Sequence, residues 1–211
     1  MCCGYHAVTH LLPTVQPTDP DGPSGKLATR RALLTLRDAM TAASRHVADA
    51  AIADATKLLL AQRFVAGSII TLYAAKGSEV ATAQIDAAAR ALGLVVAYPR
   101  VIGRARALAF HTVALDQLSD ARWGLREPSA DAAMVALEDI SAFVVPGLAF
   151  DRAGGRIGWG QGHYDATFAA APSALRIGLA YECQLVDSVA REPHDVALHF
   201  IITEVATLAV A

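Results

Sequence analysis

Residues 144–165 read VVPGLAFDRAGGRIGWGQGHYD, and this stretch joins an apolar run to a glycine-rich loop. The apolar residues at its start are typical of a buried strand, and Pro146-Gly147 turns the chain where that strand ends. Five glycines follow between positions 154 and 162. Because glycine tolerates positive φ and has no Cβ, a backbone of this composition can lie close to a ligand. The stretch therefore predicts a strand, a turn and a ligand-binding loop.

The charged residues of this loop indicate phosphate chemistry. Backbone N–H groups in a glycine loop suit phosphate oxygens, as does the positive end of a helix that starts near Tyr164. Arg156 adds fixed positive charge, and Asp165 can hold a metal ion that bridges phosphates. The spacing matches neither G-x-x-x-x-G-K-[ST] nor G-x-G-x-x-G. From spacing alone, a glycine-rich hairpin loop with a surface arginine therefore remains the alternative.

Helical and strand patterns alternate on both sides of the loop. Apolar residues at three- to four-residue steps between Leu33 and Leu58 predict one long or two short amphipathic helices. Further helices are expected at residues 82–92 and 164–170, and strands at residues 68–74, 94–98, 107–113, 142–145, 176–181 and 198–203. This alternation implies crossover connections, and hence a mostly parallel sheet covered by helices on both faces. Ligands of such sheets bind beyond the carboxyl ends of the strands, where Glu79, Pro99 and the glycine loop fall.

The composition favours a single enzyme-sized domain and excludes several classes of partner. The chain has 211 residues, of which 54% are hydrophobic, and its net charge of −2 offers no basic field for nucleic acid. No apolar run approaches the roughly 18–20 residues that span a membrane. Three cysteines without disulfide or zinc spacing predict a cytoplasmic protein. Residues 1–25 hold four of the nine prolines, so we expect a flexible extension before a single domain at residues 26–211.

The sequence resembles the 5-formyltetrahydrofolate cyclo-ligases, also called methenyltetrahydrofolate synthetases. VPGLAFD at residues 145–151 and GRIGWGQGHYD at residues 155–165 are similar to the family's signature. The likeness runs in the same order from about residue 26 to residue 205, and includes a K-x-x-x-R segment at Lys26 and Arg30. It implies an α/β fold, a three-layer sandwich with a mostly parallel central sheet flanked by helices.

The resemblance also implies a set of site residues, with Arg156 as the catalytic residue. The implied ATP- and phosphate-binding residues are Lys26, Arg30, Arg156, Gly158, Trp159, Gly160, Gln161, Gly162, His163 and Tyr164. The implied folate-binding residues are Tyr73, Glu79, Trp159, Gly160, Gln161, Gly162 and His163. The implied magnesium ligands are Asp165 and Asp195. At positions 161 and 163 the family usually has glycine or lysine and tyrosine, so the substrate contacts of Gln161 and His163 stay open.

Most of these residues also have an ordinary structural explanation. Asp165 is a suitable N-cap for the predicted helix, and Asp195 suits a turn after proline. Lys26 and Arg30 fit a solvated helix start, and Glu79 fits a surface acid. For the large aromatic side chains, core packing is the alternative to stacking on the substrate: Tyr73, Trp123 and Trp159.

The resemblance implies an enzyme that uses ATP and Mg²⁺ to convert 5-formyltetrahydrofolate into 5,10-methenyltetrahydrofolate, releasing ADP and phosphate. Such phosphoryl transfer requires positioning and charge neutralisation more than a protein nucleophile, and no Ser-His-Asp or Cys-His arrangement is visible. A related enzyme acting on another folate or small amide, or a non-catalytic folate- or nucleotide-binding module, is the alternative. We expect a reduced folate as the small-molecule partner, no nucleic acid or membrane partner, and a monomer, with a dimer as the alternative.

Overall fold

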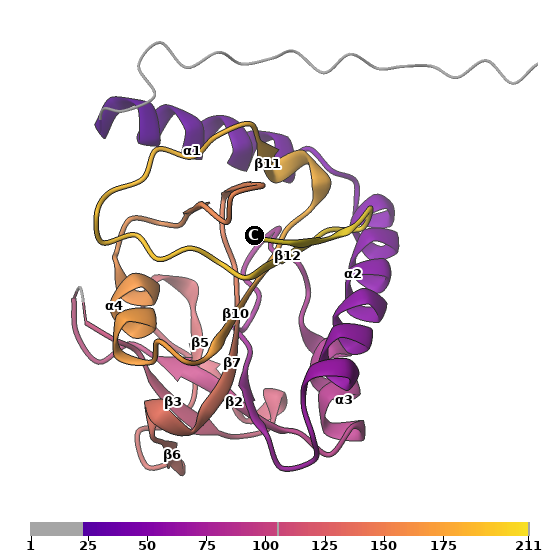
Figure 1. Cartoon of the computed structure of the whole chain (residues 1–211), viewed down its shortest axis with the longest axis vertical. Coiled ribbons are helices and arrows are strands. Elements are labelled where there is room, and N and C mark those ends of the chain that lie inside the picture. Colours follow the sequence, from indigo (N-terminus) through magenta and orange to yellow (C-terminus); the bar gives the residue numbers. More distant parts are fainter. Residues whose placement is uncertain (1–22, 105, 211) are drawn as a thin grey trace, which may run out of the picture.

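The computed structural model describes residues 23–104 and 106–210, with side chains from residue 27 onward. Within these residues the chain forms three layers, a large central sheet and the helices on its two faces (Figure 1). The helices are α1 (Pro23–Asp38), α2 (Ala42–Arg63), α3 (Ala83–Ala91) and α4 (His163–Ala170). The strands are β1 (Ile69–Thr71), β2 (Val95–Arg100), β3 (Ala109–Thr112), β4 (Ser119–Asp120), β5 (Arg126–Glu127), β6 (Met134–Val135), β7 (Ile140–Val145), β8 (Ala149–Asp151), β9 (Arg156–Ile157), β10 (Leu175–Leu179), β11 (Leu185–Val186), β12 (Phe200–Ile202) and β13 (Thr207–Ala209).

The central sheet has eight strands in the order β13-β12-β10-β7-β1-β2-β3-β6. Its five middle strands, from β12 to β2, are parallel, whereas β13, β3 and β6 pair antiparallel at the two edges. A smaller sheet, β11-β8-β9, carries the sequence that surrounds the glycine loop. The prediction of a mostly parallel sheet flanked by helices is confirmed.

Strand β7 lies between β1 and β10 and is buried on both faces. Ala142 and Val144 pack in the core that includes α2 and α3, and Phe143 and Val145 pack in the core that includes α4. All four side chains are fully buried. A strand covered on both faces is apolar along its whole length, which explains the uninterrupted run before Pro146.

Helices cover the two faces of the sheet unequally. On one face, α2 and α3 contribute Ile52 and Ile85, and on the other Phe168 of α4 packs against Phe143, with ring centroids 5.7 Å apart. Figure 1 shows α1 running past the small sheet, where Leu33 packs against Ala149. No helix of the described residues is both long and apolar enough to cross a membrane.

The structure decides one open alternative and extends one predicted strand. The helical pattern between Leu33 and Leu58 forms two helices rather than one, because Thr41 caps α2 by accepting a hydrogen bond from the Ser44 N–H at 3.0 Å. The strand predicted to end before Pro99 continues through Pro99 to Arg100. Pairing of β2 with β1 ends at Ala97, and beyond it only β3 pairs with β2, so the missing N–H of proline is tolerated there.

The predicted amino-terminal extension is only partly within the described residues. Helix α1 begins at Pro23, so the boundary expected at residue 26 falls inside its first turn. Proline suits the start of a helix because its missing N–H would have no partner there. Residues 1–22 lie outside the described part of the chain.

Phe143→Ala is expected to lower the free energy of unfolding by about 3–5 kcal/mol, because it leaves a cavity between Phe110 and Phe168. Leu58→Ala on α2 is the matched control, since Leu58 is 60% exposed, and it should change stability by less than about 0.5 kcal/mol. Urea unfolding measures both. Equal effects would contradict the described core.

Candidate active site

A cavity of about 630 Å³ opens beyond the carboxyl ends of the parallel strands. This volume lies within the range of about 300–1,000 Å³ that is usual for small-molecule sites. Pro146 after β7 and Ala74 after β1 form part of its wall. The cavity is lined by all the predicted site residues whose side chains are described: Arg30, Tyr73, Glu79, Arg156, residues 158–164, Asp165 and Asp195. Lys26 lies in α1, but its side chain is outside the described part of the chain.

The glycine loop, residues 154–162, carries Arg156 and approaches its side chain closely at Gly158. A Cβ at Gly158 would lie 2.7 Å from Arg156 Nη1, so a larger residue there would displace the guanidinium. The Gly158 carbonyl accepts a hydrogen bond from Arg30 Nε at 2.9 Å, which ties α1 to the loop. Gly162 is the N-cap of α4 and has a left-handed φ of 67°, which glycine adopts without strain.

Arg156 is a buried cation beside the cavity. Its side chain is 7% exposed, and its Nη2 donates to Asp165 Oδ1 at 3.4 Å. The guanidinium carbon lies 5.3 Å from the centroid of the Tyr164 ring, a cation–π contact. The buried Nε has no hydrogen-bond partner among the described residues. The alternative of an arginine exposed on a surface loop is therefore wrong.

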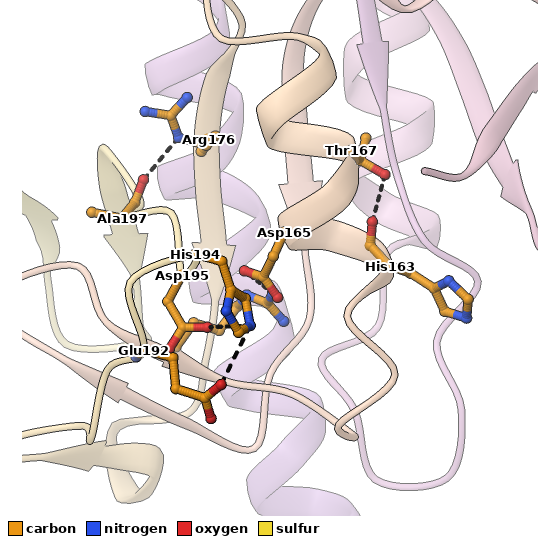
Figure 2. A network of polar contacts seen from close by, with 9 residues as sticks. His163, Asp165, Thr167, Arg176, Glu192, His194, Asp195 and Ala197 are labelled. Atoms are coloured by element: carbon orange, nitrogen blue, oxygen red, sulfur yellow. Dashed lines mark hydrogen bonds and ion pairs between the residues drawn. The ribbon is translucent and has the colours of Figure 1, made fainter. Parts of the chain in front are cut away.

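Two aspartates from different segments face the same cavity. Asp165 lies in the first turn of α4, but Gly162 is the N-cap, so the capping alternative for Asp165 is wrong. Figure 2 shows Asp165 facing the segment that carries Glu192, His194 and Asp195. Asp195 Oδ2 accepts from the Glu192 N–H at 2.7 Å, so Asp195 also serves the turn predicted after Pro193.

Glu79 also lines the cavity and is held by two donors. Its carboxylate accepts from the Lys76 N–H at 2.9 Å and from Trp159 Nε1 at 3.4 Å. Burial raises the pKa of Glu79 above its ordinary value, so Glu79 is not an ordinary surface acid. Tyr73 is 3% exposed and its hydroxyl donates to the Val80 carbonyl, so most of this ring belongs to the core.

The two tryptophans of the chain do not pack in the core. Trp123 is 64% exposed and Trp159 is 52% exposed, and both line the cavity. Trp123 has a φ of 61°, and its carbonyl accepts a hydrogen bond from Lys76 Nζ. Core packing is therefore the wrong explanation for both rings.

Residues 23–204 match the 5-formyltetrahydrofolate cyclo-ligase family. This chain belongs to that family. A 5-formyltetrahydrofolate cyclo-ligase of Mycolicibacterium smegmatis is 31% identical over 188 residues, which cover 86% of this chain and 94% of that protein. The predicted family and the prediction of a ligase are confirmed.

Solved structures of methenyltetrahydrofolate synthetases share the fold. The Aquifex aeolicus 5,10-methenyltetrahydrofolate synthetase superposes with a TM-score of 0.74 at 22% identity, covering 88% of this chain and 92% of that one. The Mycoplasma pneumoniae enzyme superposes with a TM-score of 0.70 at 22% identity, covering 85% of this chain and 98% of that one. At this identity the likeness establishes the cyclo-ligase fold.

The two residues that depart from the cyclo-ligase pattern both line the cavity. Gln161 is exposed at the tip of the glycine loop. His163 is the first residue of α4, and its Nδ1 lies 3.0 Å from the Arg106 carbonyl oxygen. A carbonyl can only accept, so this contact places the proton on Nδ1. Figure 2 shows that the His163 and Asp165 side chains leave α4 on different sides.

Sequence reasoning missed one buried residue that supports the site. Arg37 is 2% exposed, and it donates from Nε to Ser78 Oγ at 2.9 Å and from Nη1 to the Gly147 carbonyl at 3.3 Å. It therefore joins α1 to the turn after β7 and to the loop before Glu79. The available signal was the four-residue step from buried Leu33, which places Arg37 on the same face of α1.

Arg156→Ala is expected to lower the free energy of unfolding by about 2 kcal/mol, because it removes a charge-assisted hydrogen bond and a cation–π contact from a buried position. Arg152→Ala in the same hairpin is the control, since Arg152 is exposed. Urea denaturation followed by circular dichroism measures both variants. If the two variants were equally stable, the buried contacts of Arg156 would carry no weight.

Proposed function

We propose that this chain uses ATP to close 5-formyltetrahydrofolate to 5,10-methenyltetrahydrofolate, with release of ADP and phosphate. The observation that carries the proposal is the buried guanidinium of Arg156, which comes from a glycine loop and lines the same cavity as two aspartates. The family's name supports the folate reaction, and the chemistry of the cavity supports a nucleotide phosphate beside the folate.

The phosphate end of ATP fits the glycine loop. The loop leads into the amino terminus of α4, where unpaired N–H groups and the helix dipole favour negative charge. Arg30 donates to the Gly158 carbonyl, and the Arg156 guanidinium lies next to Gly158, so two guanidinium groups contact the loop. Charge that develops on a transferred phosphoryl group would be neutralised by groups already in place.

Asp165 and Asp195 fit a magnesium ion bound together with the phosphates. Their side chains are 21% and 23% exposed and both line the cavity. Mg²⁺ is usually bound by one or two carboxylates, several waters and substrate phosphates, so no third protein ligand is required. When bound, it would neutralise phosphate charge and orient the γ-phosphate.

The folate fits the part of the cavity that Glu79 and Trp159 line. The Glu79 carboxylate can accept two hydrogen bonds from an amino-pyrimidine edge, which is the polar end of a pterin. Trp159 donates to the Glu79 carboxylate, and its exposed ring offers a flat surface next to Glu79 on which a pterin can stack. Because Trp159 is part of the glycine loop, a pterin bound beside it would lie next to the phosphate end of ATP.

The reaction then proceeds by phosphorylation of the formyl oxygen. This oxygen forms a bond to the γ-phosphorus as the bond between that phosphorus and ADP breaks. The neighbouring amine of the same folate attacks the formyl carbon and loses its proton, and the carbon–oxygen bond to phosphate breaks. The protein binds, orients and neutralises charge, and supplies no nucleophile.

Two other functions remain testable alternatives: a related ATP-dependent enzyme that acts on another folate or a small amide, and a non-catalytic folate- or nucleotide-binding module. The paired aspartates favour an enzyme, since a pure binder has no need of a phosphoryl-transfer metal site.

Purified protein is expected to form methenyltetrahydrofolate from 5-formyltetrahydrofolate only when ATP and Mg²⁺ are both present. Ultraviolet absorbance follows the product, and a phosphate assay follows ATP use. Phosphate release with another folate only would favour the first alternative. Binding of folate and ATP without turnover would favour the binding module, and product formed without ATP would overturn the proposal.

Asp165→Asn is expected to raise the Mg²⁺ concentration for half-maximal activity by about tenfold or more, because it removes a negative charge that Mg²⁺ prefers. Asp195→Asn should act in the same direction. Asp139→Asn serves as the control because Asp139 is exposed in a 3₁₀ turn at Leu137–Asp139. If neither cavity variant shifts the Mg²⁺ titration, ATP alone holds the metal and the two assignments are wrong.

The Glu79 carboxylate must be ionised to accept from a pterin, so folate affinity is expected to fall as the pH drops through its raised pKa. The acid limb of kcat/KM should therefore lie above the ordinary value of 4.5. Glu79→Gln should lower kcat/KM by about tenfold or more and remove that limb. The same raised pKa has the opposite effect on stability, because burial favours the neutral carboxyl. The contribution of Glu79 to the free energy of unfolding is full below its unfolded pKa and is lost as the pH rises through its folded pKa.

The control for this pH profile is Glu138→Gln, since Glu138 is exposed in the same 3₁₀ turn as Asp139. It should keep both the rate and the acid limb. An acid limb that persists unchanged in Glu79→Gln would assign the titration to another group.

A further inference from the structure

Asp151 is a buried carboxylate that the proposed reaction does not use. It ends β8 and is 3% exposed. Its Oδ1 accepts from the Ala153 N–H at 3.0 Å and from the Gly155 N–H at 2.7 Å. These two bonds close the turn between β8 and β9, the strand that begins with Arg156. Asp151 therefore fixes the base of the glycine loop.

The same carboxylate binds a second segment of the chain. Its Oδ2 accepts from the Val189 N–H at 2.8 Å, and its Oδ1 lies 3.2 Å from Arg191 Nη2. That guanidinium also donates to the Ala153 carbonyl. Val189 and Arg191 belong to residues 187–199, the segment between β11 and β12 that carries Asp195. The Asp151–Arg191 pair thus joins the base of the glycine loop to the Asp195 segment.

A second contact between these segments lies farther along the chain. The Leu198 N–H donates to the Gly154 carbonyl at 2.9 Å. The stretch between Val189 and Leu198 is therefore attached to the β8–β9 turn at both ends, and Asp195 lies on the part between them. The described residues 187–199 include no helix and no strand, so these attachments position the stretch.

We propose that Asp151 and Arg191 are positioning residues that set the place of Asp195 relative to Arg156 and Asp165. This inference rests on the proposed function, because it gives the Asp195 segment a role in binding a divalent cation with a nucleotide. A carboxylate accepts about four hydrogen bonds, and Asp151 uses its acceptors on two segments at once. Loss of the pair removes the side-chain part of this attachment and loosens the Asp195 segment, whereas Glu79 makes its contacts with Lys76 and Trp159 and is unaffected.

Arg191→Ala is the test, because the Arg191 side chain is 38% exposed and its loss leaves the backbone bonds of Asp151 intact. The probe is Mn²⁺ with a non-hydrolysable ATP analogue, and electron paramagnetic resonance measures the bound Mn²⁺. The Kd for Mn²⁺ in this ternary mixture should rise about tenfold, as for other residues that orient metal ligands. The Kd for 5-formyltetrahydrofolate, read from tryptophan fluorescence, should change less than twofold.

Arg152→Ala is the matched control, an exposed arginine next to Asp151, and it should leave both Kd values unchanged. If Arg191→Ala does not fold, Arg191→Lys makes the same test, since it keeps the charge but loses the planar fork. Unchanged Mn²⁺ binding, or equal weakening of Mn²⁺ and folate binding, would overturn the inference. Weaker Mn²⁺ binding in Arg191→Ala supports it even if the wild-type protein forms no methenyl product, which would refute the proposed function alone.

Discussion

Burial of strand β7 on both faces is the constraint on which the rest of the structure depends. A strand without a solvent-facing side cannot carry polar chemistry along its length, so the chemistry follows its end at Pro146. The parallel neighbours β1 and β10 bring their own ends to the same edge. Arg37 and Gln184 then hold the turn itself, since both donate to the Gly147 carbonyl.

Both cations and carboxylates line the cavity beyond this edge. Arg156 is buried next to Asp165, and Asp195 approaches from a segment near the carboxyl terminus. The guanidinium is paired, but its Nε has no partner among the described residues, and a phosphate oxygen nearby would offset the cost of that one unsatisfied donor. Two further residues that line the cavity are unusual. Trp123 has a strained, left-handed φ, and the pKa of Glu79 is raised. Departures from ordinary structure are thus concentrated where the ligands would bind.

The sequence predicted the elements with a strong local pattern. The apolar run of β7, the helix that became α3 and the turn residues around Pro146 all have periodicity or punctuation that a single segment reveals. The small sheet β11-β8-β9 was not predicted, because strands of two or three residues show no period. The identity of the site residues was predicted from the family resemblance. The structure places those with described side chains around one cavity.

Contacts between distant segments were beyond sequence reasoning. The burial of Arg156 depends on Tyr164 and Phe168 packing against its guanidinium, and an arginine among glycines gives no sign of this. The burial of Arg37 could not be predicted for the same reason, because its acceptors on Ser78 and Gly147 lie 41 and 110 residues away in the sequence. In the sequence, Asp151 is only the last residue of the VPGLAFD signature, and nothing there indicates its bonds to Val189 and Arg191.

Activation of the formyl oxygen by phosphoryl transfer can be followed with an oxygen isotope. 5-Formyltetrahydrofolate labelled with ¹⁸O in its formyl group is converted with unlabelled ATP, and ³¹P nuclear magnetic resonance detects the label in the released phosphate. Phosphorylation of the formyl oxygen predicts one ¹⁸O atom in each phosphate formed with the methenyl product. Phosphate without the label, formed at the same rate as product, would contradict it.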